Sequence, residues 1–243
     1  MAYTGIEMIA LSECIRVFIT GDIHGEDGIG RFSAKNWPVG RTLRKDDIVL
    51  IAGDFGLVFT GGKTENHWLD WLDKRPWTTL FIDGNHENFP LLLSYPEEER
   101  FGGTVGVLRP SVLHLKKRGG VYTIGARRVW CFGGAPSFDK NERTEGKSWW
   151  AEEEANAEER DYARKVLADG AEVDFALTHD APLSLQKKIY GALTVPARTS
   201  KFLDEVCGLI QTDRWYFGHH HIDAEYCSGG IAFRALYTDI IEI

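Results

Sequence analysis

The stretch FITGDIHG, residues 18–25, passes directly from an apolar run to side chains that can bind a metal ion. The run CIRVFIT (14–20) is rich in β-branched and aromatic residues and predicts a buried strand. Gly21 allows the backbone to turn sharply and lets another group come close, and Asp22 and His24 follow at once. Because sites in open α/β sheets form at the carboxyl ends of strands, this stretch predicts an α/β fold with a site at that edge.

The same order, an apolar run followed at once by a metal-capable side chain, occurs at four more places in the sequence. These places are LIAGD (50–54), FIDGNHE (81–87), FALTHD (175–180) and YFGHHH (216–221). Since the carboxyl ends of parallel strands meet at one edge of a sheet, we expect these polar side chains to converge.

Further patterns place the secondary structure between these points. Buried strands are predicted at 14–20, 47–52, 78–82, 121–124, 128–132, 173–178, 214–217 and 231–243, and helices at 64–75, 150–169 and 199–210. Strands and helices alternate through the first third of the chain, which predicts parallel βαβ units. The closing strands follow one another directly and indicate antiparallel pairing. We expect one α/β domain over residues 1–243, with a mixed sheet or two packed sheets, because no linker is evident.

Composition and charge exclude several classes of protein. The formal net charge is -8 and there is no dense run of Lys and Arg, which argues against long nucleic acids and anionic lipid surfaces as partners. No segment approaches the roughly 20 apolar residues of a membrane span, and the first residues, MAYTGIEMIALSECIRV, lack the pattern of a signal peptide. The four cysteines are scattered and form no C-x-x-C pair, so we expect reduced thiols and a cytoplasmic setting. The oligomeric state stays open.

The residue types at the five strand ends predict the kind of metal site. Asp, Asn and His without Cys suit Mn, Fe, Zn, Ni or Mg better than Cu(I) or an iron–sulfur cluster. The potential ligands are too many for one tetrahedral zinc ion, but they suit two ions that share a carboxylate about 3.5–4 Å apart. In the row His219, His220 and His221, alternate members of an extended backbone point the same way, so the row is either part of this site or an inert surface cluster.

The ordered set D-x-H, G-D, G-N-H-E, a later H and G-H-x-H resembles the calcineurin-like metallophosphoesterases. The pieces span residues 22 to 221, and their order and their positions at strand ends make the resemblance specific. The resemblance implies a four-layer α/β/β/α sandwich with the site at one edge. It implies one metal ion held by Asp22, His24 and His221, a second held by Asn85, His179 and His219, Asp54 as the bridge between them, His86 as a catalytic residue and His220 as a residue that is not a ligand.

The expected activity is hydrolysis of small phosphate esters by a hydroxide generated from metal-bound water, with two divalent cations, manganese first, as cofactors. A protonated His86 would donate to an oxygen at the phosphorus. The natural substrate and the preference between monoesters and diesters stay open. The alternatives are a non-catalytic metal-binding scaffold for a protein partner, a protein Ser/Thr phosphatase and a nuclease.

One departure concerns the second motif, which continues as G-D-x-x-D-R-G in the protein Ser/Thr phosphatase branch. Here it reads GDFGLVF, with Leu57 and Val58 in place of the aspartate and the arginine. Another cation would therefore have to grip the phosphate. Segment 133–150 offers Lys140, Arg143 and Lys147 as candidates, although solvated loop charges are the plainer interpretation.

The remaining polar residues have simpler interpretations. We expect His67 to be a surface or packing residue on a helix and His114 to be a strand residue. Glu87 is expected to bond backbone near the site. Asp180 would either orient His179 or cap the next turn.

Overall fold

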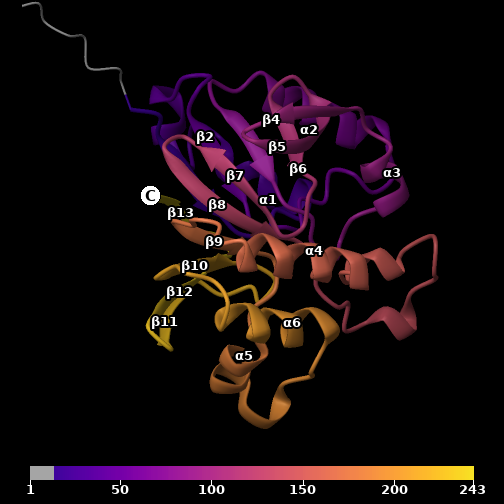
Figure 1. Ribbon diagram of the computed structural model, residues 1–243. Coiled ribbons are helices and arrows are strands. Elements are labelled where there is room, and N and C mark those ends of the chain that lie inside the picture. Colours follow the sequence, from indigo (N-terminus) through magenta and orange to yellow (C-terminus); the bar gives the residue numbers. More distant parts are fainter. Residues whose placement is uncertain (1–13) are drawn as a thin grey trace, which may run out of the picture.

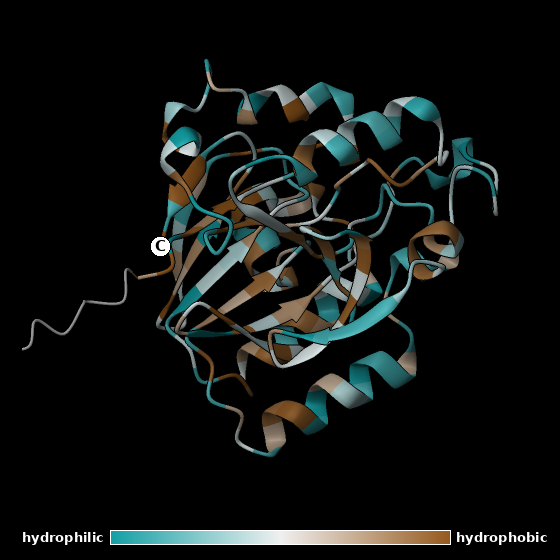
Figure 2. Ribbon diagram, turned by 90° about the horizontal axis from the view of Figure 1, so that it is seen from above, coloured by the Kyte–Doolittle hydropathy of each residue, from teal (hydrophilic) through white to brown (hydrophobic). Residues whose placement is uncertain are grey.

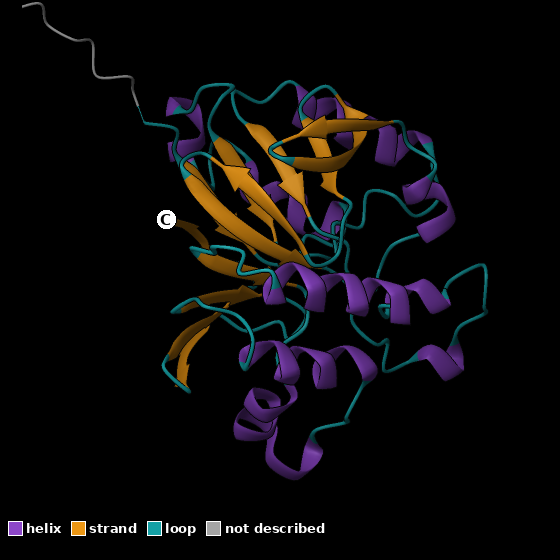
Figure 3. Ribbon diagram, viewed as in Figure 1, coloured by secondary structure: helices purple, strands orange, loops and turns teal. Residues whose placement is uncertain are grey.

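Two stacked β-sheets lie between two layers of helices in the computed structural model, which describes residues 14–243 (Figures 1 and 3). The expected four-layer α/β/β/α sandwich is confirmed. The prediction that no signal peptide is present falls mostly on residues 1–13, outside the described residues. No helix within residues 14–243 is both long and apolar enough to cross a membrane.

The first sheet is built around four parallel strands. Its order is β13 (Ile240–Glu242), β1 (Val17–Thr20), β2 (Ile48–Ile51), β3 (Thr78–Phe81), β6 (Val112–Leu115), β5 (Gly103–Arg109) and β4 (Glu97–Arg100). The pairs β1–β2, β2–β3 and β3–β6 are parallel, which confirms the predicted βαβ units, and β6 confirms the strand at His114. The strands β13, β5 and β4 pair antiparallel with their neighbours.

The second sheet also has a parallel centre and antiparallel edges. Its order is β11 (Ala224–Ser228), β12 (Ile231–Ala235), β10 (Arg214–Phe217), β9 (Phe175–Thr178), β8 (Arg127–Phe132) and β7 (Gly120–Ile124). The predicted antiparallel pairing of the closing strands is wrong, because β10 and β12 pair parallel; β11, which pairs antiparallel with β12, was not predicted. The strand β11 follows β10 in sequence but lies at the sheet edge, so β10 pairs with β12 rather than with the next strand along the chain.

The predicted strand 231–243 is two strands in different sheets. The break follows Leu236, where the carboxylate of Asp223 accepts hydrogen bonds from the backbone N–H groups of Tyr237, Thr238 and Asp239 at 2.8–3.1 Å. These bonds hold a turn that sends β13 to the first sheet, where it pairs with β1.

Helices cover the outer face of each sheet. They are α1 (Glu26–Ile29), α2 (Lys63–Asp73), α3 (Phe89–Leu93), α4 (Ala157–Ala168), α5 (Leu183–Tyr190) and α6 (Arg198–Cys207), with short 3-10 helices η1 (Gly30–Phe32), η2 (Pro38–Thr42), η3 (Lys140–Glu142), η4 (Ala151–Glu153) and η5 (Gly191–Leu193). Side chains alternate along each strand, so Ile19 of β1 packs between the sheets while Phe18 packs on the outer face against Trp37. A third apolar cluster lies between the second sheet and α4–α6, and the helices are hydrophilic on much of their surface (Figure 2).

The predicted helix 150–169 begins seven residues later than expected, at Ala157. Asn156 is the N-cap: its side chain accepts from the N–H of Glu159 at 3.0 Å, and the Glu159 carboxylate accepts from the N–H of Asn156 at 2.8 Å. This capping box satisfies N–H groups that have no partner inside the helix. The acidic residues before it form the 3-10 turn Ala151–Glu153 instead.

A buried charge cluster anchors the loop after β3, and no pattern in the sequence predicted it. Arg118 donates to Asp83 Oδ2 from Nε at 2.8 Å and also from Nη2, and His114 Nε2 lies 3.2 Å from Asp83 Oδ1. Burial alone would raise the pKa of Asp83, but the charge of Arg118 and the contacts with His114 together outweigh burial and hold the pKa below its usual range. Asp83 directly precedes Gly84 and Asn85, so this pair fixes the start of a segment of the site.

Removing the cation of this pair should destabilise the fold. Arg118→Met leaves the Asp83 carboxylate buried without its partner, and we expect the free energy of unfolding in urea to fall by about 3–5 kcal/mol. Arg128→Met, which removes an arginine 44% exposed and 3.4 Å from Glu172, should change it by less than about 1 kcal/mol. Adding Asp83→Asn to Arg118→Met should restore part of the loss. Equal stability of Arg118→Met and the unmodified protein would contradict this account.

Candidate metal centre

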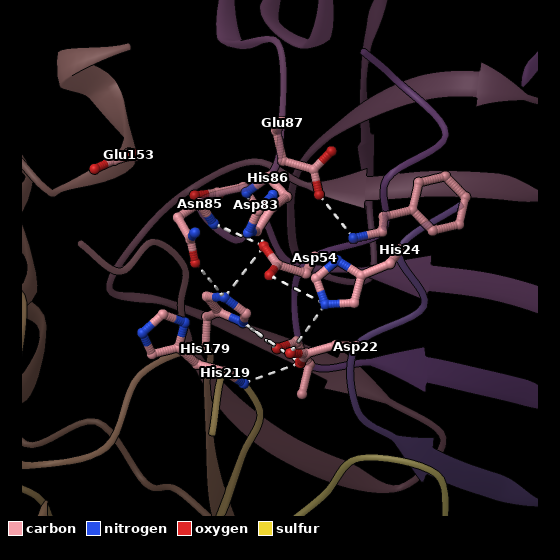
Figure 4. Close-up of polar contacts among 12 residues, drawn as sticks. Asp22, His24, Asp54, Asp83, Asn85, His86, Glu87, Glu153, His179 and His219 are labelled. Atoms are coloured by element: carbon pink, nitrogen blue, oxygen red, sulfur yellow. Dashed lines mark hydrogen bonds and ion pairs between the residues drawn. The ribbon is translucent and has the colours of Figure 1, made fainter. Parts of the chain in front are cut away.

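Five strand ends, three from the first sheet and two from the second, bring their polar side chains to one rim of the sandwich (Figure 4). The strands are β1, β2 and β3 in one sheet and β9 and β10 in the other. The residues that meet there are Asp22, His24, Asp54, Asn85, His86, His179, His219 and His221.

Asp22, His24 and His221 form the first group of potential ligands. Their ligand atoms all lie within 4.8 Å of one another. The Nε2 atoms of His24 and His221 are 2.9 Å apart, and Asp22 Oδ2 lies 3.1 Å from His221 Nε2 and 3.7 Å from His24 Nε2. A separation of 2.9 Å is compatible with two imidazoles bound to one ion at bond lengths of about 2.1 Å.

Asp54, His179, His219 and Asn85 form the second group. His179 donates from Nδ1 to the carbonyl of Ala52 at 2.7 Å, so Nε2 faces the site, 3.1 Å from Asn85 Oδ1. A backbone bond of this kind orients a metal-binding histidine. His219 Nε2 is buried without any hydrogen-bond partner, an arrangement that a bound cation would complete.

The carboxylate of Asp54 lies between the two groups. Its Oδ2 is 3.7 Å from His24 Nε2 in the first group, and its Oδ1 is 3.3 Å from His179 Nε2 in the second. The backbone N–H groups of Asn85 and His86 donate to Oδ1 at 2.8 Å each and hold the carboxylate in place. One oxygen thus faces each group, as a bridging carboxylate requires.

The backbone at this rim adopts a conformation that L-residues seldom use. His24, Asp54, His219 and His221 have φ between 46° and 63°, and within residues 14–243 the one other non-glycine residue with positive φ is Phe101. Such left-handed backbone costs energy and concentrates at functional sites.

Glycines at the strand ends make room for the polar groups. A Cβ on Gly84 would lie 2.0 Å from Asp54 Oδ1, one on Gly53 would lie 2.2 Å from His179 Nδ1, and one on Gly218 would lie 2.4 Å from Asp22 Oδ1. The prediction that glycine lets another group come close is therefore confirmed at these three positions.

Two buried carboxylates, those of Asp22 and Asp54, determine the electrostatics of the rim, and neither forms an ion pair with a lysine or an arginine among the described contacts. Burial alone would raise the pKa of Asp22, but its contacts with His221 and His24 lower it to about 2, and His179 lowers that of Asp54 below its usual range in the same way. Burial alone would lower the pKa of His179, yet Asp54 and then Asp22 raise it to about 10. Burial lowers the pKa of His219 to about 4. The site therefore attracts positive charge, and a metal ion would compete with the proton on His179.

Buried polar residues around the rim hold its backbone and side chains. Glu87 accepts from the N–H of Phe55 at 2.7 Å, as expected. Asn85 donates from Nδ2 to Ser137 Oγ at 3.1 Å, and that hydroxyl donates to Glu153 Oε2 at 2.7 Å, which turns the amide oxygen of Asn85 toward His179. Ser137 and Glu153 were not predicted, because Ser137 follows β8 and Glu153 lies in η4, both far from Asn85 in sequence.

His220 faces away from both ligand groups. Its Nε2 lies 3.2 Å from Asp180 Oδ1, and its ring packs on that of Tyr190. Asp180 also accepts from the N–H of Ala181 at 2.8 Å, so it orients His220 and the following turn rather than His179. His67 stands beside Trp68 on α2, away from the rim.

Of the predicted substrate-binding residues, the structure brings Arg143 to the site and not Lys140. Arg143 Nη2 lies 3.4 Å from both ring nitrogens of His86, and both residues line a cavity of about 560 Å³ beside Asp54 and Asn85. Lys140 and Lys147 are exposed and do not line that cavity, and Lys140 Nζ stands 6.0 Å above the ring of Trp149.

The donors at this rim fit divalent cations of borderline-to-hard character. Carboxylate, amide and imidazole groups converge on the same space, no thiol lies among them, and His219 Nε2 is left without a partner. The two groups share Asp54, so the residues present can hold either one ion or a pair.

A sandwich of two sheets with aspartate, asparagine and histidine gathered at its rim defines a metal-dependent enzyme of the α/β/β/α type. The family model of the calcineurin-like phosphoesterases matches residues 15–223, so the chain belongs to that family and is a metallophosphoesterase, a hydrolase.

A comparison with solved structures found likenesses to two bacterial proteins. A putative 5′-nucleotidase from Staphylococcus aureus, solved in complex with alpha-ketoglutarate, has a TM-score of 0.52 at 15% identity over 91% of this chain and 48% of that chain. The phosphopantetheinyl hydrolase from Mycobacterium tuberculosis has a TM-score of 0.45 at 14% identity, over 93% of this chain and 90% of that one. A comparison with curated proteins gave no match. At these identities the first likeness shows the fold alone, and this chain spans about half the length of that protein.

A methyl group at Gly84 should weaken metal binding. The Cβ of Gly84→Ala would lie 2.0 Å from Asp54 Oδ1 and push that carboxylate out of place, so we expect manganese affinity, measured by calorimetry, to fall by at least about 10-fold. Gly30→Ala is the control, because its Cβ would meet no atom within 4 Å and its φ is -60°. Undiminished affinity in folded Gly84→Ala would show that Asp54 does not hold the metal.

Proposed function

We propose that this chain hydrolyses small phosphomonoesters or phosphodiesters with two divalent cations, manganese being the first choice and iron, zinc, nickel or magnesium the alternatives. The observation that carries the proposal is the position of Asp54, with one carboxylate oxygen toward His24 and the other toward His179. In the proposed arrangement Asp22, His24 and His221 hold one ion, Asn85, His179 and His219 hold the other, and Asp54 bridges them.

When bound, such a pair of cations supplies Lewis-acid polarisation of phosphoryl oxygens and a lowered pKa of bound water. The chain's own residues orient the reaction around it. The bond from His179 Nδ1 to the carbonyl of Ala52 fixes which ring nitrogen faces the metals. Asp22 and Asp54 supply the negative charge that retains the cations.

His86 and Arg143 are proposed to contact the phosphoryl group. Burial lowers the pKa of His86; the charge of Asp54 opposes this effect and the charge of Arg143 adds to it, so the site without metal or substrate disfavours the protonated ring that the sequence led us to expect. A bound phosphate dianion would raise the pKa again, because opposite charge favours the protonated ring. Arg143 is the one Lys or Arg side chain that lines this cavity within the described part of the chain, and a guanidinium suits phosphate oxygens.

The alternative functions find less support in the same residues. A non-catalytic scaffold has no need of a full ligand set together with His86 beside Arg143. A protein Ser/Thr phosphatase would use the aspartate and arginine that Leu57 and Val58 replace, and both of these residues are buried in the core. A nuclease acting on long chains would need more cationic residues along its groove than Arg143 alone.

A reducing cytoplasmic setting is also proposed for this enzyme. The four cysteines are free in the described residues, although Cys131 is fully buried and Cys14 and Cys227 are exposed. Exposed unpaired thiols are typical of reducing compartments.

His86→Ala tests the catalytic role directly. Because a positioned donor contributes about 10²–10⁴-fold in rate, kcat on a phosphate ester should fall by that factor while the manganese content of the purified protein stays unchanged. Retention of wild-type kcat in the metal-loaded variant would remove His86 from the mechanism.

Arg143→Ala tests the phosphate contact. We expect KM to rise by about tenfold or more, because a charged hydrogen bond to the phosphate is worth roughly 1.5–3 kcal/mol, with metal content unchanged. Lys140→Ala is the matched control and should leave KM as it is, since Lys140 does not line the cavity. Equal KM values for both variants and the unmodified enzyme would assign the phosphate contact elsewhere.

A further inference from the structure

Three exposed apolar side chains gather on the cavity that contains Asn85 and His86. Phe138, Leu193 and Val195 are 64%, 84% and 60% exposed, and no other large apolar side chain within residues 14–243 exceeds 44%. Single exposed apolar residues are common on protein surfaces, but the three most exposed ones here border one cavity. A gathering of this kind marks a binding surface.

These side chains come from two segments far apart in sequence. Phe138 follows β8, and its ring stacks on that of His219 with centroids 5.5 Å apart and planes inclined by 26°. Leu193 ends η5 and Val195 follows it, and Tyr190, which packs on His220, lines the same cavity. The cavity of about 560 Å³ is of the size that holds organic ligands.

The polar part of the cavity accepts one anionic group. Arg143 and His86 stand together there with Asn85, and Arg143 also donates from Nε to Asp139 at 2.8 Å. No second Lys or Arg lines the cavity within the described residues. The lining therefore fits a ligand with one phosphate at one end and an uncharged apolar body at the other.

We propose that the substrates are phosphate esters of apolar, bulky alcohols, whose organic group lies against Phe138, Leu193 and Val195 while the phosphate lies at Arg143 and His86. This inference rests on the proposed phosphoesterase function and adds the substrate class. Burial of apolar surface favours binding of such esters over small polar ones. The apolar side chains therefore determine which esters bind and take no part in the reaction at phosphorus.

The test compares two esters with similar alkoxide leaving groups, ethyl phosphate and phenethyl phosphate, with the manganese-loaded enzyme. We expect kcat/KM to be at least about tenfold higher for phenethyl phosphate, since even one added methylene in an apolar pocket is worth about 10-fold or more. The corresponding phosphonates, which are not hydrolysed, give the same comparison as binding affinities by calorimetry.

The decisive variant is Leu193→Ser with Val195→Ser, which touches none of the proposed ligands. It should reduce the preference for the phenethyl compound to less than about threefold, in kcat/KM and in affinity, and leave ethyl phosphate unaffected. The matched control is Leu93→Ser with Val39→Ser, which alters the same residue types at exposed positions that do not line this cavity. It should keep the full preference.

The outcomes separate this inference from the proposed function. If both esters are hydrolysed at the same efficiency, or if the Leu193 and Val195 variant keeps the preference, the apolar subsite is overturned and the phosphoesterase function stands. If neither ester is hydrolysed but the phenethyl phosphonate binds more tightly and loses that advantage in the variant, the subsite stands and the proposed reaction is wrong. Equal binding of both phosphonates together with no hydrolysis would reject both.

Discussion

Two carboxylates, those of Asp22 and Asp54, are almost completely buried where the sheets meet, and the neighbouring groups at the rim compensate for their negative charge. Burying a carboxylate is costly unless cations or hydrogen bonds compensate for it. The chain supplies backbone N–H groups of Asn85, His86 and His219 and the imidazoles of the rim. Among the described contacts, no lysine or arginine side chain forms a hydrogen bond or ion pair with either carboxylate. The pKa of His179 is raised to about 10 for this reason. Divalent cations would stabilise a site with this excess of negative charge. The arrangement of strand ends that buries the two carboxylates is therefore also the one that provides a metal site.

Bringing the polar side chains of five strand ends together strains the backbone. Four potential ligands adopt left-handed φ angles, and Gly53, Gly84 and Gly218 leave space that no Cβ could share with a neighbouring polar atom. Strain of this kind persists only when the surrounding structure enforces it. Here three apolar clusters, one between the sheets and one on each outer face, enforce it by holding the five strand ends in register. The buried pair Asp83–Arg118 adds a polar anchor directly before Gly84.

The sequence predicted the parts of the molecule that depend on local order along the chain. Strand ends, the glycines and the convergence of polar residues follow from apolar periodicity and from the geometry of parallel strands. The pairing of β10 with β12 could not be predicted, because β11 lies between them in sequence but at the sheet edge in space. Arg118 and Ser137 were missed for a similar reason, since each meets its partner across about 35–52 positions of the chain and neither carries a motif. The ligand roles themselves stay predictions until metal is measured.

The second motif lacks the aspartate and the arginine of the protein Ser/Thr phosphatase branch, and an arginine from another segment lies near the site instead. Leu57 and Val58 are buried among apolar residues, so that segment contributes packing and no charge to the phosphate. The cation near His86 is instead Arg143, which comes from the segment after β8. That segment also carries Phe138, stacked on His219. The proposed phosphate contact and the Phe138 part of the proposed apolar surface therefore lie on one loop, so a change in its conformation would alter affinity for the phosphate and selection of the organic group together.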